Sequence, residues 1–166
     1  MRILGIDPGL RLTGYGCVES VPRTVKTRRG FGADAALVEG GVIRLDGKVS
    51  VSRRLVELDQ DLREIIERLQ PEAVAVEKLY AHYKHPTTAI IMGHARGVVL
   101  LNIQRAGLKF VELGATEVKK SLTGNGHASK EQMQAGVQAQ LGLAAPPRPA
   151  DVADAIAIGL CALRRV

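Results

Sequence analysis

Two short runs built from apolar residues and glycine constrain the fold of this chain most strongly. Residues 3–6 read Ile-Leu-Gly-Ile and precede Asp7 and the turn-forming pair Pro8-Gly9, and residues 73–76 read Ala-Val-Ala-Val. Each run is short and lacks polar alternation, which is typical of a strand covered on both faces. Since such strands are mostly parallel, we predict that residues 73–76 pair in parallel with residues 2–7 near the centre of a sheet.

The remaining segments predict strands and helices in an order typical of an α/β fold. Apolar residues recur at helical spacing from Leu55 to Leu69, where Ser52 can cap the start and Pro71 follows the end. Three strands come first and strands then alternate with helices, which indicates a mixed sheet flanked by helices in one domain over residues 1–166. The other expected elements are strands at residues 10–19, 35–45 and 109–113, helices at residues 87–104, 116–122, 130–141 and 151–165, and a basic loop at residues 21–34.

Composition narrows the classes of function. The chain has 23 Lys and Arg against 17 Asp and Glu, and the resulting net charge of +6 favours an anionic partner without identifying it. No stretch approaches the roughly 20 apolar residues of a membrane span, and the first residues do not follow the pattern of a signal peptide. Cys17 and Cys161 lie far apart without metal-ligand spacing. We therefore expect buried free thiols in a protein of the reducing cytoplasm.

Acidic residues end both apolar runs. Asp7 follows the first run and Glu77 follows the second. A carboxylate at the end of a buried strand is costly to keep ionised unless something pairs with it, and in α/β sheets ligands bind at such strand ends. Each acid taken alone could equally emerge into a solvated loop. A shared ligand site is favoured only if further acids are expected at the same place.

A second pair of acids lies at the start of the last expected helix. Asp151 and Asp154 are three positions apart and share a face with Ile158, and residues 155–163 are uncharged. The helix is therefore expected to be buried nearly all round, with its acids pointing toward the sheet. Asp151 could instead cap the helix, with Asp154 favoured in the first turn by the helix dipole. Capping accounts for one of the two acids but not for both.

Carboxylates that converge from two strand ends and one helix could not all stay ionised without a cation. Oxygen ligands without His or Cys favour Mg²⁺ or Mn²⁺ over zinc. A pair of such ions can activate a water and stabilise the leaving oxygen in phosphodiester hydrolysis. A basic chain with an acidic metal pocket is therefore a candidate nuclease, in which Lys and Arg side chains hold the substrate backbone.

A series of short motifs runs along nearly the whole chain. In order they are residues 2–9 (RILGIDPG), 13–16 (TGYG), 75–80 (AVEKLY), 94–97 (HARG), 118–120 (VKK), 123–126 (TGNG) and 150–157 (ADVADAIA). In this order, and on a chain of this length, they closely resemble the RuvC family of Holliday junction resolvases, endonucleases of the ribonuclease H-like fold. The chain departs from that pattern at residues 21–40, which look longer and more basic than the usual hairpin connection.

The resemblance implies a function for the four acids. Asp7, Glu77, Asp151 and Asp154 would be the catalytic acids and would bind two Mg²⁺ ions per subunit, with Mn²⁺ able to substitute. The family acts as a homodimer that resolves four-way DNA junctions by symmetric nicks during recombination and repair. A branch-migration complex of the RuvA–RuvB type is the implied partner.

The resemblance also implies DNA-binding residues. Lys119 and Lys130 fall where the family places basic residues needed for cleavage, and Tyr80 falls where it carries an aromatic that stacks on an unpaired base near the crossover. Lys120 lies beside Lys119, and these lysines flank residues 123–126, whose backbone N–H groups we expect to be free for phosphate. An ordinary solvated face is the alternative for the lysines, and a core position is the alternative for Tyr80.

One expected helix is a candidate for the dimer contact, and two other classes of function remain to be compared. The helix at residues 87–104, where Gly93 and Gly97 permit close approach, is expected to supply much of the dimer contact. A sugar-kinase or actin-like ATPase opens with a similar strand, Asp-x-Gly and a Thr-Gly hairpin but needs a second domain. A non-catalytic nucleic-acid-binding module gives no reason for four acids. None of the histidines shows metal-ligand spacing, and we assign no ligand role to them: His82, His85, His94 and His127.

Overall fold

A five-stranded mixed sheet organises residues 1–21, 35–79 and 86–166, which are the residues described by this computed structural model. The sheet order is β3-β2-β1-β4-β5, with antiparallel pairing of β1 with β2 and of β2 with β3, and parallel pairing of β4 with β1 and β5. This confirms the expected α/β class and the parallel pairing of residues 73–76 with the first strand. The strands are β1 (Arg2–Asp7), β2 (Leu12–Ser20), β3 (Ala35–Arg44), β4 (Ala73–Glu77) and β5 (Lys109–Leu113).

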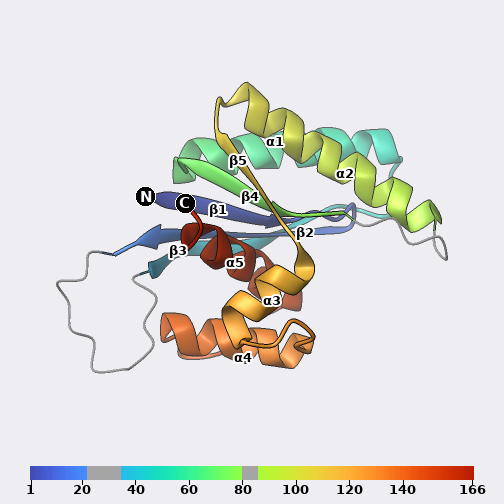
Figure 1. The fold of residues 1–166 in the computed structure, drawn as a ribbon. Coiled ribbons are helices and arrows are strands. Elements are labelled where there is room, and N and C mark those ends of the chain that lie inside the picture. The colour runs from blue at the N-terminus through green and yellow to red at the C-terminus, as the bar shows by residue number, and fades with distance from the viewer. Residues whose placement is uncertain (22–34, 80–85) are drawn as a thin grey trace.

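Helices cover the sheet in two layers (Figure 1). One layer contains α1 (Val51–Leu69) and α2 (Pro86–Arg105), which share a hydrophobic cluster with one face of the sheet. On the opposite face lies α5 (Ala150–Leu163), with α3 (Ala115–Thr123) and α4 (Lys130–Leu141) farther from the sheet. In the described ranges, no helix has the length and apolar character needed to cross a membrane.

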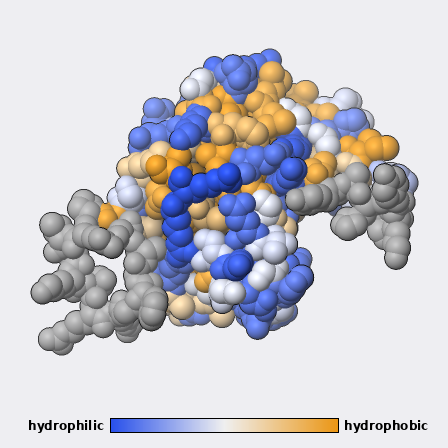
Figure 2. All heavy atoms as spheres, viewed as in Figure 1, coloured by the Kyte–Doolittle hydropathy of each residue, from blue (hydrophilic) through white to orange (hydrophobic). Residues whose placement is uncertain are grey.

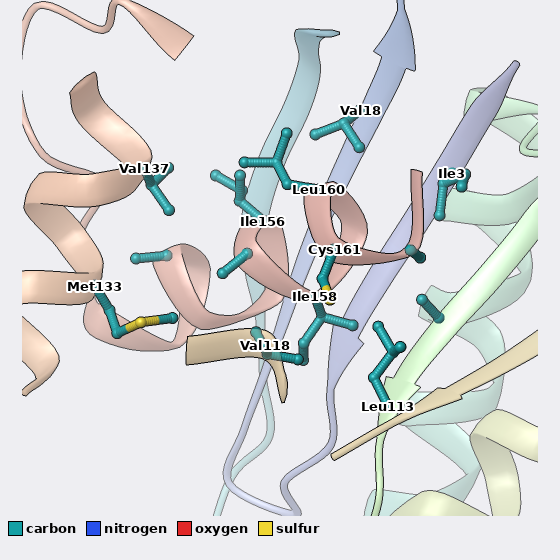
Figure 3. Packing of buried hydrophobic residues seen from close by; sticks show 14 of the residues in the cluster. Ile3, Val18, Leu113, Val118, Met133, Val137, Ile156, Ile158, Leu160 and Cys161 are labelled. Atoms are coloured by element: carbon teal, nitrogen blue, oxygen red, sulfur yellow. The ribbon is translucent and has the colours of Figure 1, made fainter. Parts of the chain in front are cut away.

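The contact between α5 and the sheet depends on glycine. A Cβ atom added at Gly5 of β1 would lie 2.1 Å from the Ala155 carbonyl oxygen, and one added at Gly16 of β2 would lie 2.5 Å from the Ile156 side chain. Only glycine permits such an approach, because it places no atom where the helix backbone lies. As a result α5 lies directly on β1 and β2, and its residues Ile156, Ile158 and Leu160 fill the core of this layer (Figure 3).

Several boundaries differ from those expected from the sequence. The N-cap of α1 is Ser50, whose Oγ accepts from the Arg53 backbone N–H at 3.4 Å, and Ser52 lies inside the helix. The second strand begins at Leu12 because residues 8–11 form the turn after β1, and the third ends one residue earlier than expected. The last helix begins one residue earlier and ends two residues earlier. Cys17 and Cys161 are buried and free, as expected. The expected loop at residues 21–34 lies outside the described residues except for its first residue.

Candidate active site

The ends of two neighbouring parallel strands place two acids at the same edge of the sheet. Asp7 is the last residue of β1 and Glu77 is the last residue of β4, and the register pairs Ile6 with Val76 just before them. Both carboxylates line one pocket of about 210 Å³, together with Asp154 of α5. The two apolar runs thus end where the sequence indicated, and the acids do not simply emerge into separate solvated loops.

Asp151 and Asp154 reach this region through the first turns of α5. Asp154 lines the pocket, whereas Asp151 does not line it but lies close enough for its charge to act on Asp7 and Asp154. The N-cap of α5 is Pro149, and no side chain makes a capping hydrogen bond to this helix within the described part of the chain. The capping role considered for Asp151 is therefore wrong. Its backbone is held instead by the sheet, since a Cβ atom at Gly14 would lie 2.1 Å from the Asp151 carbonyl oxygen.

Burial and mutual repulsion raise the pKa values of the pocket carboxyls. Burial is the main cause at Asp7, where the charges of Asp154, Glu77 and Asp151 add to it and raise the pKa from 3.8 to about 7, against the opposing charge of Lys130. Burial also raises the pKa of Glu77, with a further contribution from Asp154, and raises that of Asp154. The pocket is therefore short of positive charge, although lysines lie at its border.

Two of the three candidate lysines border the pocket. Lys119 of α3 and Lys130, the first residue of α4, line it beside the acids. Lys119 opposes the rise in pKa of Glu77 and Asp154, and Lys130 opposes it at Asp7 and Asp154. Lys120 is exposed and does not line the pocket. The solvated-face alternative therefore describes Lys120 better than the other two lysines.

The loop at residues 123–126 uses most of its backbone donors internally. The Asn125 N–H donates to Thr123 Oγ1 at 3.1 Å, the His127 N–H donates to Asn125 Oδ1 at 2.9 Å, and the Gly124 N–H donates to the Lys120 carbonyl at 2.9 Å. The expectation that these N–H groups are free for phosphate is therefore wrong for Gly124 and Asn125. The side chains of this loop compete successfully for the backbone donors, as Thr and Asn often do in turns.

Thr13 fixes the loop that follows Asp7, a role that the sequence did not reveal. Its buried hydroxyl donates to the Gly9 carbonyl at 2.6 Å, and its oxygen accepts from the Gly9 N–H at 3.2 Å. The available signal was a threonine directly before a glycine at the start of the second strand, four residues after Gly9. The two bonds close the turn and hold the end of β1 against the start of β2.

Of the remaining candidates, two histidines lie in the described part of the chain. His94 and His127 are exposed and do not line the pocket. Tyr80, His82 and His85 lie outside the described residues.

The donor set of the pocket fits a hard divalent cation. Its acidic side chains offer carboxylate oxygens, the ligands that Mg²⁺ and Mn²⁺ prefer. In residues 1–21, 35–79 and 86–166, no three His, Cys, Asp or Glu side chains converge closely enough to hold an ion between them. The carboxylates instead line a shared cavity, where burial first and mutual repulsion second raise their pKa values.

Comparison with known proteins identifies the relatives of this arrangement. The family model described as crossover junction endodeoxyribonuclease RuvC matches residues 3–162. Proteins of that name from Synechococcus sp. strain CC9311 and from Moorella thermoacetica are 42% and 47% identical over 160 and 161 residues, which cover 96% and 97% of this chain and 96% and 90% of theirs. The solved structure of T. thermophilus RuvC in complex with a Holliday junction substrate superposes with a TM-score of 0.83 at 34% identity, covering 97% of this chain and 92% of that one. The match confirms the expected ribonuclease H-like fold.

Proposed function

The chain belongs to the RuvC family of crossover junction endodeoxyribonucleases, and on that basis we propose that it resolves four-way DNA junctions by paired, metal-dependent nicks during recombination and repair. The observation that carries the proposal is one pocket that joins Asp7, Glu77 and Asp154, from three separate elements, with two lysines at its border. Membership of this nuclease family excludes the two alternatives considered from the sequence, an ATPase and a non-catalytic nucleic-acid-binding module. We treat residues 1–166 as a single nuclease domain.

Each acidic residue has a distinct place in the proposed chemistry. Asp7, Glu77 and Asp154 would hold the cations in the pocket, and Asp151 would add its negative charge from the first turn of α5. Two Mg²⁺ ions per subunit, or Mn²⁺ in their place, would supply Lewis acidity to the attacking water and to the leaving oxygen. The repulsion among these carboxylates, which helps to raise their pKa values, favours binding of a cation because added positive charge relieves it.

The basic residues would hold the scissile strand over these acids. Lys119 and Lys130 border the pocket, so their ammonium groups can contact phosphates next to the cut. Lys120 is exposed one position further along α3 and would contact the backbone farther from the cut. By its place in the family motif, Tyr80 would stack on an unpaired base at the crossover.

Symmetric cutting of a junction with two-fold symmetry requires two active sites related by a two-fold axis. We infer a homodimer that pairs through α2, where Cβ atoms at Gly93 and Gly97 would meet nothing within 4 Å and where Ile90 and Leu101 are 60% and 46% exposed. Hydrophobic side chains also gather over the layer of α2 and β5 in the space-filling view (Figure 2). A RuvA–RuvB type complex in the cytoplasm would deliver the junction.

The direct test is to incubate the protein with a synthetic four-way junction and Mg²⁺ and to map the cuts on all four strands. We expect one nick at the same position in each of two strands of like polarity, and products that ligase can reseal. A linear duplex of the same sequence is the control for structure selectivity. Equal cutting of junction and duplex, or uncut junction in Mg²⁺ and in Mn²⁺, contradicts the proposal.

A further inference from the structure

Arg96 is a charged residue inside a largely apolar helix, and its side chain connects three elements. The side chain is 13% exposed. From α2, its Nη1 donates to the backbone carbonyl of Glu77 at 3.1 Å, and its Nη2 forms an ion pair with Glu112 of β5. Its guanidinium lies over the Phe110 ring, 5.8 Å from the ring centroid. A helix in one layer is thereby tied to the ends of two neighbouring strands, the central strand β4 and the edge strand β5.

The bond to Glu77 completes the support of one peptide unit. The Lys78 N–H donates to the Leu113 carbonyl of β5 at 2.7 Å. In a trans peptide the carbonyl points the opposite way from the N–H, so the Glu77 carbonyl points away from β5. No partner on β1 is available there, because the pairing of β4 with β1 ends at Val76 and Ile6. Arg96 supplies the donor that the strand ladder no longer provides. With both polar atoms of the Glu77–Lys78 peptide held, the backbone at Glu77, and with it the direction in which its side chain leaves the chain, is held in place.

Arg96 approaches the acids from the side opposite to the lysines. It lines a small hollow with Asp7, Glu77 and Met92, whereas the larger pocket that contains Lys119 does not include it. The hydrogen bonds of its guanidinium go to the Glu77 carbonyl and to Glu112, so it supports the pocket through the backbone that it holds.

We propose that Arg96 is a positioning residue for Glu77 that sets the affinity of the pocket for divalent cations. The inference rests on the metal site proposed above. A ligand carboxylate at a strand end binds well only if its backbone is already in place, and loss of a group that orients a ligand typically weakens metal binding at least about tenfold. The fork of the guanidinium serves two acceptors at once, which the single ammonium of lysine does less well.

The test compares Mn²⁺ binding by wild type, Arg96→Ala, Arg96→Lys and Phe110→Leu, measured by electron paramagnetic resonance of free Mn²⁺ without DNA. Phe110→Leu is the matched control, because it removes the ring beneath the guanidinium and leaves the bond to Glu77. We expect about tenfold weaker Mn²⁺ binding for Arg96→Ala, partial recovery for Arg96→Lys and little change for Phe110→Leu. Junction affinity in Ca²⁺ and thermal melting of each variant are recorded in parallel.

The outcomes separate this inference from the proposed function. If wild type neither binds Mn²⁺ nor cuts junctions, the metal site itself is wrong. If wild type binds Mn²⁺ and folded Arg96→Ala binds it equally well, the positioning role alone is wrong. Equal losses in Arg96→Ala and Phe110→Leu also overturn it, because they assign the effect to general packing. If Arg96→Ala does not fold, the ratio between Arg96→Lys and wild type decides, with equal binding contradicting the role.

Discussion

The two helices that support the candidate active site do so by different means. On one side, α5 lies against strand glycines with no room for a Cβ atom, so Asp154 is held by steric contact between backbones. On the other side, α2 keeps Gly93 and Gly97 open and reaches the site through the hydrogen bond from Arg96 to Glu77. The face of α5 that carries Asp154 is buried against the sheet and is not available to a partner. The outer face of α2 is open at Gly93 and Gly97, where we propose that the dimer forms. The same helix therefore supports Glu77 on its inner side and can bind a second subunit on its outer side.

The largest expected effect contrasts a glycine under α5 with one on α2. Gly5→Ala places a methyl group 2.1 Å from the Ala155 carbonyl oxygen and should cost about 3 kcal/mol or more, since backbone atoms must move. Gly97→Ala meets nothing within 4 Å and should change the stability of the monomer by up to about 1 kcal/mol in the favourable direction, from helix propensity. Urea unfolding, at a concentration where all chains sediment as monomers, measures both. Equal stabilities would show that α5 does not lie on β1 as described.

An effect of similar size is expected from neutralising a crowded carboxylate. Because the pKa of Asp7 is raised from 3.8 to about 7, the folded protein binds more protons than the unfolded chain between these values. The stability of wild type in EDTA should therefore fall as pH rises from about 4 to 7, by up to about 4 kcal/mol, and stay low above 7. Asp7→Asn should melt higher than wild type in EDTA at pH 8 and show no such advantage at pH 4.

Added metal provides the control for this experiment. Mg²⁺ should raise the melting temperature of wild type more than that of Asp7→Asn, because the variant lacks one carboxylate for the ion. The cation competes with protons for the same oxygens, so higher Mg²⁺ should move the acid limb of the cleavage rate to lower pH. An Asp7→Asn variant that melts below wild type in EDTA at pH 8 contradicts the crowded pocket.

The smallest expected effects concern the lysines on the α5 side of the pocket. Lys119→Ala and Lys130→Ala should each remove about one phosphate contact and reduce the slope of log binding constant against log salt by about one unit. Tyr80→Ala should weaken cleavage without changing that slope, because stacking releases no counterions. Filter binding to a junction across a salt series measures the slopes, and identical slopes for all variants and wild type would refute these assignments.

The strand-end acids could be predicted from sequence because each follows a short apolar run. A residue that directly follows a buried strand lies at the edge of the sheet, so its position is known once the strand is recognised. Asp154 followed from helical spacing in the same way. The glycine contacts beneath α5 could not be predicted, since nothing local to Gly5 or Gly14 says which helix crosses it. The role of Arg96 was missed for a similar reason, although a lone cation among the apolar residues of 89–103 was a visible signal. The free loop donors at Gly124 and Asn125 were expected in error, because the side chain of Thr123 and the end of α3 take up these N–H groups.

Single-turnover cleavage of a four-way junction by Asp154→Asn, measured beside its junction affinity, tests the central claim most directly. This substitution keeps the shape of the side chain and removes one charge from the pocket that joins β1, β4 and α5. The account expects junction binding close to that of wild type and cleavage reduced at least about a hundredfold, as for loss of a group that acts on the reacting atoms. Cleavage by Asp154→Asn at the wild-type rate would show that this acid acts only through the helix dipole, and the shared metal pocket would have to be abandoned.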